Sequence, residues 1–392
     1  MRLTTQWERI AVLLTASVFS LSTSLSQQAR LEWLGILSGG SFSVAQDVSN
    51  NGVCVGYGDV AGGLSRGWIF RNGHLNILHY GSDTNHSFAL SISPDGNYVG
   101  GATATLDQAN YLVGGLPVVW SLAGSCHYSV FPHPDAYIAT GSVDDINSNL
   151  TAAVNLNKAA VGPAKGFTWA ICSATYRNIA LSHPCFSPDH FATSEVLSIS
   201  YTGQALTGNT RCSAEFATMA DSVAFVLDRG TVRLLTNNAA SFCDEICNNS
   251  RAASISGNGD IVSGTVGLHA PQSGVWNRQL GWRWEAFSDF SYATPAPSNG
   301  IDYNGFIVVG TTGNTAVLWQ RQRNRWRGID LTEFCRSRGL LQESEALIRA
   351  NAVSPNGRYI VGVGRRLVQG SYRTEAFRLD MGRSFPVPVP IE

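Results

Sequence analysis

The chain has 392 residues, with 27 Lys and Arg against 28 Asp and Glu, so its formal net charge is −1. Only 14% of the residues are charged, against about a quarter in typical soluble domains. The sequence therefore lacks the basic field that would attract nucleic acid or an anionic membrane. Its 44% hydrophobic content and 40 glycines suit a large core and many turns.

Residues 1–26 have the features of a secretory signal peptide. A polar start with two arginines is followed by the apolar residues 10–21, which are too few to span a bilayer. Residues 24–26 (Ser-Leu-Ser) form a small-x-small cleavage site, so we expect a mature protein that begins at Gln27 and is secreted or periplasmic. A retained membrane anchor is the alternative. No later apolar run is long enough to span, so no membrane insertion is expected after the leader is removed.

Residues 31–37 (LEWLGIL) form the first predicted strand, and seven copies of one phrase follow it. The phrase is Ile/Val-Ser-x-Asn/Asp-Gly, then three or four mostly apolar residues, then Gly. The copies begin at Val48, Ile92, Ile146, Ile199, Ile255, Ile301 and Val353. A period of about 50 residues is typical of a repeat architecture.

Each phrase predicts a tight β-hairpin, because Asn-Gly and Asp-Gly tolerate the positive φ that such turns need. The second arm is apolar and β-branched, which favours a buried strand. The third copy, at residues 146–150, is the most divergent, since it has lost both Ser and Gly. We expect the hairpins near residues 45–57, 89–101, 143–155, 196–208, 252–264, 298–310 and 350–362.

A second apolar run, often with Trp or Phe, follows each hairpin, and several repeats then have a further strand, as at residues 75–78 and 232–235. Four short antiparallel strands per repeat are the signature of a β-propeller blade. The sequence therefore predicts an all-β fold, a seven-bladed β-propeller of four-stranded antiparallel blades that forms a single domain over residues 27–392. An open array, or a ring of six blades with a remnant, is the alternative.

The last two repeats are separated by a predicted short helix, with Asp330 as its N-cap, Glu333 completing a capping box and Gly339 at its end. The final repeat lacks a fourth strand, because proline interrupts residues 383–388. We expect residues 31–37 to supply that strand beside residues 374–380. The N-terminal strand would thus close the ring and leave no exposed sheet edge.

Eight cysteines suit an oxidising compartment. The pairs Cys172 with Cys185 and Cys243 with Cys247 lie in or beside predicted loops, where a cross-link restricts the unfolded chain, so we expect two disulfides there. The Cys243–Cys247 spacing also admits a metal site, but no second Cys or His pair at ligand spacing accompanies it, so no metal is expected. Cys54, in a core strand, is expected to be a buried thiol.

The short, similar hairpin turns indicate a structural face, and the long variable loops of the opposite face are the expected binding surface. None of the polar residues there has the paired spacing of a metal site, so solvated loop side chains are the alternative to ligand contacts. The candidate ligand-binding residues are His127, His133, His183, His190, Asp189 and Arg365. Glu195 accompanies the histidines as a further acid.

Two other sets of residues bear on activity. Asp144-Asp145 and Asp244-Glu245 are interpreted as exposed turn carboxylates rather than a glycosidase pair, because nothing in the sequence fixes their separation. The candidate tryptophans for a sugar-stacking surface are Trp276, Trp282, Trp284 and Trp326, with core packing as the alternative.

Several short motifs occur in the repeats: residues 34–40 (LGILSGG), 45–49 (AQDVS), 222–225 (SVAF), 374–377 (TEAF), 350–357 (ANAVSPNG) and 360–364 (IVGVG). In these motifs the chain resembles the probable extracellular repeat family called the HAF repeat. The resemblance extends over about residues 30–380, is specific in the first and last repeats and weak in the third and fourth, and lacks the family's His before Ala-Phe. The resemblance implies a secreted or surface-exposed bacterial β-propeller and no particular reaction.

Two functions fit these observations. The first is a secreted binding or scaffold module that binds a protein or glycan through its long-loop face. The second is a propeller-type hydrolase or lyase with acid and base residues around the central channel. No nucleophile, metal or nucleotide motif is present, so no catalytic residue and no cofactor are assigned, and fold alone does not choose between the two. Carboxylates or histidines that converge at the channel mouth from different blades would favour the enzyme.

Overall fold

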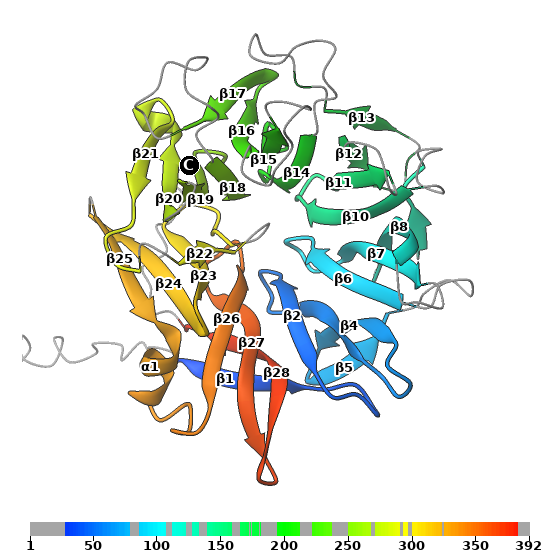
Figure 1. Ribbon diagram of the computed structural model, residues 1–392, viewed down its shortest axis with the longest axis vertical. Coiled ribbons are helices and arrows are strands. Elements are labelled where there is room, and N and C mark those ends of the chain that lie inside the picture. The colour runs from blue at the N-terminus through cyan, green and yellow to red at the C-terminus, as the bar shows by residue number, and fades with distance from the viewer. Residues whose placement is uncertain are drawn as a thin grey trace, which may run out of the picture.

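The computed structural model is a ring of seven four-stranded antiparallel sheets, a seven-bladed β-propeller, which confirms the predicted fold (Figure 1). The first strand of each blade lies near the centre of the ring and the fourth at its rim. The described residues are 28–78, 86–106, 112–122, 128–132, 139–158, 165–171, 173, 175–179, 181, 194–211, 222–236, 250–267, 271–290, 293–296, 300–323 and 325–382.

In each of the first three blades the strands follow chain order from the centre of the ring to its rim. They are β2 (Ser43–Val48), β3 (Cys54–Asp59), β4 (Ser65–Arg71) and β5 (His74–Ile77); β6 (His86–Ile92), β7 (Tyr98–Leu106), β8 (Leu112–Ser121) and β9 (Tyr128–Val130); and β10 (Ala139–Ile146), β11 (Thr151–Lys158), β12 (Lys165–Ala170) and β13 (Tyr176–Asn178).

The next three blades follow the same order, and a 3₁₀ turn, η3 (Arg278–Leu280), lies within blade five. They are β14 (Ser194–Ile199), β15 (Ala205–Arg211), β16 (Ser222–Asp228) and β17 (Thr231–Leu235); β18 (Ser250–Ile255), β19 (Ile261–Val266), β20 (Gln272–Asn277) and β21 (Arg283–Ala286); and β22 (Thr294–Pro295), β23 (Ile307–Thr312), β24 (Thr315–Gln322) and β25 (Arg325–Asp330).

Blade seven joins the two ends of the ring. It consists of β26 (Ala346–Val353), β27 (Tyr359–Val368), β28 (Ser371–Asp380) and, as its outer strand, β1 (Arg30–Gly35). β1 pairs antiparallel with β28, with Leu31 opposite Leu379 and Trp33 opposite Phe377. The predicted closure by the N-terminal strand is therefore confirmed.

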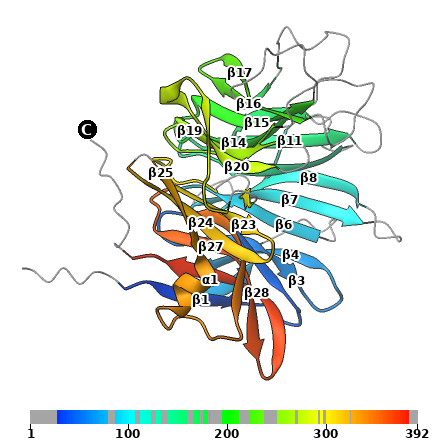
Figure 2. The ribbon, with the colours of Figure 1, turned by 60° about the vertical axis from the view of Figure 1, so that its left-hand side comes forward.

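The helix predicted before blade seven is α1 (Leu331–Arg336), on the outer side of the ring (Figures 1 and 2). Asp330 caps it, because its carboxylate accepts hydrogen bonds from the N–H groups of Thr332 and Glu333. Glu333 instead pairs with Arg336 at 2.9 Å. Leu331 and Cys335 anchor the helix in the core between blades six and seven.

All seven hairpin turns are held by the same side-chain bond. The second residue of each phrase accepts a hydrogen bond from the N–H that begins the second arm, as in Val53 N to Ser49 Oγ at 3.1 Å. The bond recurs in every copy. Asn147 and Asp302 supply the acceptor where Ser is absent. Even the divergent third copy thus forms its turn, with Leu150 at φ 55° in the place of Gly.

In six of the seven blades the last glycine of the phrase lies at a close approach of two strands, and in blade three Val154 holds that position. Every inner strand except the very short β22 has a β-bulge just before its turn. There the carbonyl of the inner strand sits where a Cβ on the second strand would be; at Gly208 the overlapping oxygen is that of Glu195. The same overlap occurs at Gly56, Gly101, Gly264, Gly310 and Gly362.

The hydrophobic core is divided into seven clusters, one between each pair of neighbouring blades. The third strands supply a fully buried Trp or Phe to these clusters, such as Trp68, Trp169 and Phe225. Each blade therefore buries its apolar surface only against its neighbours. An incomplete ring would expose two such faces, which is a physical reason for its closure.

We predict that Gly208→Ala destabilises the protein by about 1–3 kcal/mol, because the new Cβ meets backbone that cannot move without distorting the bulge. Thermal and urea unfolding measure the change. Unaltered stability would contradict the close approach of β14 and β15.

A second prediction concerns Asp302, which is buried and accepts hydrogen bonds from Phe306 N and Ile307 N. Burial raises its pKa to about 6, although these N–H groups lower it. The native state therefore binds the proton more tightly than the unfolded state, and stability falls as the pH rises from about 4 to about 6. Asp302→Asn, which copies Asn147, should lack this loss and gain about 1–3 kcal/mol over wild type at pH 7.5. Urea unfolding at pH 4.5 and 7.5 checks it; a gain equal at both pH values would contradict it.

Candidate functional site

The central channel is closed at the end where the hairpin turns lie. Asn50, in the turn of blade one, donates across the axis to the hydroxyl of Tyr201, in the turn of blade four, at 2.8 Å. The ring of Tyr201 packs edge-on against Tyr303, with centroids 5.1 Å apart. The space left between the turns is about 30 Å³, room for a few water molecules. These side chains therefore leave too little space at this end for a peptide or a sugar to pass.

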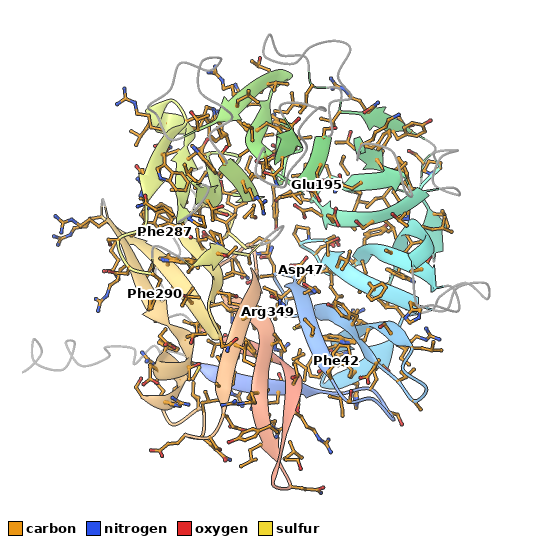
Figure 3. All side chains as sticks on the ribbon, viewed as in Figure 1. Phe42, Asp47, Glu195, Phe287, Phe290 and Arg349 are labelled. Carbon is orange, nitrogen blue, oxygen red and sulfur yellow. The ribbon has the colours of Figure 1, made fainter. Side chains whose placement is uncertain are left out.

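Charged side chains gather at the opposite end of the channel. Glu195 and Arg251 are the second residues of the inner strands β14 and β18, and Arg349 is the fourth residue of β26. All three are exposed although their strands are innermost, so solvent reaches the channel at this level. Figure 3 shows Glu195 and Arg349 on opposite sides of the centre of the ring. We call Glu195, Arg251 and Arg349 the channel-mouth charges.

Two asparagines position the first two channel-mouth charges. Asn155, on β11, bonds to both backbone groups of Val196, at 2.7 and 2.9 Å, and so fixes the strand beside Glu195. Asn209, on β15, bonds in the same way to Ala252, next to Arg251, at 3.3 and 2.8 Å. Each asparagine belongs to the preceding blade, so the charges are fixed by contacts between blades.

Arg349 is presented by an additional β-bulge. β26 alone has two register shifts among the inner strands, between Leu347 and Arg349 and between Ala350 and Ala352. Bulges turn a side chain to a new direction. In the part of the chain that the structure describes, the Arg349 side chain has no hydrogen bond or ion pair. Arg349 is therefore a charge available to a ligand.

Asp144 and Asp145 are not exposed turn carboxylates, so that interpretation was wrong. Both lie in β10 at its β-bulge, and their side chains have different surroundings. Asp145 is buried and accepts from Ile199 N of the next blade at 2.8 Å. Asp144 is half-buried and accepts from Ser142 Oγ at 2.8 Å and from Asn155 Nδ2. A single sequence gives no signal of this bulge, which decides the role of each acid.

The pKa of Asp144 is raised to about 6, chiefly by burial and in part by the negative charges of Glu195 and Asp145, while hydrogen bonds from Ser142 and Asn155 oppose the increase. Asp144 and Glu195 thus come from neighbouring blades and interact electrostatically. Two acids with different environments are the arrangement from which acid–base pairs are built.

Of the residues predicted to bind a ligand, Arg365 is the one that the structure describes. It is exposed on β27, and its guanidinium lies 4.7 Å from the ring centroid of exposed Tyr372. Its neighbour Arg366 is engaged by Glu375 at 2.9 Å. The other predicted ligand residues, His127, His133, His183, His190 and Asp189, lie outside the described residues, as do Cys172, Cys185, Cys243 and Cys247 of the predicted disulfides.

The tryptophans considered for a sugar surface belong to the core instead. Trp276, Trp282 and Trp326 are buried, and Trp284 packs on Trp276 with ring centroids 4.6 Å apart. Cys54 is a buried free thiol, as expected, and burial raises its pKa to about 12. Within the described ranges, no group of three or more His, Cys, Asp or Glu side chains could hold a metal ion. The same ranges contain no helix with the length and apolar character that crossing a bilayer would need.

No family model and no curated protein matches the sequence, so the resemblance to the HAF repeat stays a prediction. Solved structures with a similar shape have low identity. A TolB structure from Agrobacterium tumefaciens is 14% identical, with 81% of this chain and 94% of that chain covered and a TM-score of 0.44. A chain of a mitotic checkpoint complex is 13% identical, with 96% and 98% covered and a TM-score of 0.48. The structure of YCF48 bound to D1 peptide is 9% identical, with 90% and 96% covered and a TM-score of 0.46. These similarities carry no argument about ligand or activity.

We predict that Glu195→Gln lowers the pKa of Asp144, because it removes one of the negative charges that raise it. The decrease should be partial, since burial is the larger cause. Carboxyl carbon NMR of labelled aspartates, in wild type and variant, measures it. Glu285→Gln, on β21, is the control and should leave the titration unchanged. If Asp144 titrates identically in wild type and in Glu195→Gln, the two carboxylates do not interact and the prediction is wrong.

Proposed function

We propose that the protein is an exported binding module of the HAF-repeat type that holds a segment of a partner protein at the loop-side mouth of its channel. The observation that carries the proposal is the set of channel-mouth charges on the innermost strands, opposite a closed channel end. A ligand can enter from one side only, and it meets charges of both signs there. Export rests on the predicted signal peptide.

A protein ligand is favoured over a glycan by the chemistry of the mouth. A sugar-stacking surface needs exposed aromatic faces, whereas Trp276, Trp282 and Trp326 are buried and Trp284 packs on Trp276. Charges of both signs suit a polypeptide, whose acidic and basic side chains can pair with Arg349 and Glu195. Arg349 forms no hydrogen bond or ion pair with another described residue, so its exposed guanidinium has no evident role in the fold.

The test is selection of a displayed random-peptide library on the wild-type protein, followed by affinity measurement on variants. Peptides selected by wild type should bind Glu195→Lys and Arg349→Glu about ten-fold more weakly or worse, since each variant turns an attraction into a repulsion. Arg323→Glu, at the exposed turn between β24 and β25, makes the same charge change away from the channel and should have no effect. Equal affinity for wild type and both mouth variants would refute the site.

A second candidate is an acid–base hydrolase or lyase. The specific observation in its favour is the pair of Asp144 and Glu195, of which Asp144 has a pKa raised to about 6 and can hold a proton near neutral pH. The Asp144 titration bears directly on it. If Asp144 titrates at its ordinary value, this candidate loses its proton donor.

A further inference from the structure

A cavity of about 540 Å³ lies between blades three and four, on the side of the short hairpin turns and away from the channel mouth. Its volume falls in the range of sites that bind small ligands or short segments. Its apolar wall is made by Ile179, Ile199, Leu206 and Leu227. Its polar groups come from Thr151, Thr168, Arg177, Gln204 and Arg229.

Among the described residues that line the cavity, two arginines supply the only charged side chains. Arg177 comes from β13, and Arg229 from the turn between β16 and β17. Both are exposed, and neither side chain has a hydrogen bond or ion pair with another described residue. The cavity is therefore positively charged.

The next two blade junctions neutralise their arginines. Between blades four and five, Arg278 is 3.1 Å from a carboxylate oxygen of Asp228 and 3.6 Å from one of Asp260. Between blades five and six, Arg321 is 3.6 Å from Glu285. At the junction of blades three and four, the described residues that line the cavity include two arginines and no acid.

We infer that this cavity binds a short acidic peptide segment of a partner protein, in which an apolar side chain lies next to a carboxylate. Arginine pairs with carboxylates through two parallel hydrogen bonds, and the apolar wall accepts the neighbouring side chain. β13 is the outermost strand of its blade, so its outer edge can pair with an extended peptide backbone. Gln204 and Thr168 add side-chain hydrogen-bonding groups at the same place.

The test uses the full chain and two probe peptides, Ac-Leu-Asp-Leu-Glu-NH₂ and its neutral analogue Ac-Leu-Asn-Leu-Gln-NH₂, in calorimetric titrations. The acidic peptide should bind about ten-fold more tightly or better than the neutral one, and more weakly as salt is added. Arg177→Gln and Arg229→Gln should each weaken its binding about ten-fold. Because both arginines are exposed, the variants should have the same unfolding temperature as wild type.

Arg233→Gln is the matched control, because Arg233 is an exposed arginine on β17 that does not line the cavity. It should bind the acidic peptide as wild type does, as should Arg349→Glu, which separates this site from the channel mouth. No binding of the acidic peptide at millimolar concentration, equal binding of the two peptides, or indifference to both cavity arginines would overturn the inference. Octanoate, added as a competitor, tests whether the cavity binds a small amphiphile. If octanoate displaces the acidic peptide at a concentration below the peptide's own Kd, the cavity is a site for a small amphiphile and the inference is wrong.

Discussion

The hydrogen bonds between successive hairpin turns are the constraint on which the ring depends. Asn50 N donates to Pro94 O, Tyr201 N to Gly257 O and Tyr303 N to Pro355 O, at 2.8 to 3.0 Å. Three further junctions use Ser148 Oγ to Tyr201 O, Asn258 N to Tyr303 O and Asn356 N to Asn50 Oδ1. Pro94 holds the donor position in the turn of blade two, and because it has no N–H it cannot donate the corresponding bond to the turn of blade three. Because these bonds draw the turns to the axis, one end of the channel closes and any axial ligand is confined to the other.

The bulge in the inner strands connects this framework to function. It brings the carbonyl of one strand against the glycine of the next, and at the same time it separates neighbouring side chains into structural and channel-facing roles. Asp145 bonds the next blade while Asp144 stands half-buried beside Asn155. A site built this way moves only if the blades move relative to one another, which favours a rigid binding surface.

Sparse charge makes the remaining charges informative. Several acids are used as acceptors between blades: Asp47 accepts from Ile92 N at 2.6 Å, and Asp145 from Ile199 N at 2.8 Å. Others pair with arginines at blade junctions, as Glu285 does with Arg321. Against this background, Arg349 at the channel mouth and the two arginines between blades three and four, Arg177 and Arg229, are exposed and have no hydrogen bond or ion pair with another described residue.

The sequence by itself determined the seven blades, their hairpin turns and the closing strand, because Asn-Gly and Asp-Gly turns and buried β-branched arms are local signals that recur with a fixed period. The pairing of residues 31–37 with residues 374–380 followed from counting strands, whereas its register, with Leu31 opposite Leu379, came from the structure. The arginines of the channel mouth and the cavity were beyond the sequence, since Arg251, Arg349, Arg177 and Arg229 carry no motif and belong to different blades. Bulge position and the contacts between blades are tertiary properties: they decide which way a side chain points, and no local pattern encodes them.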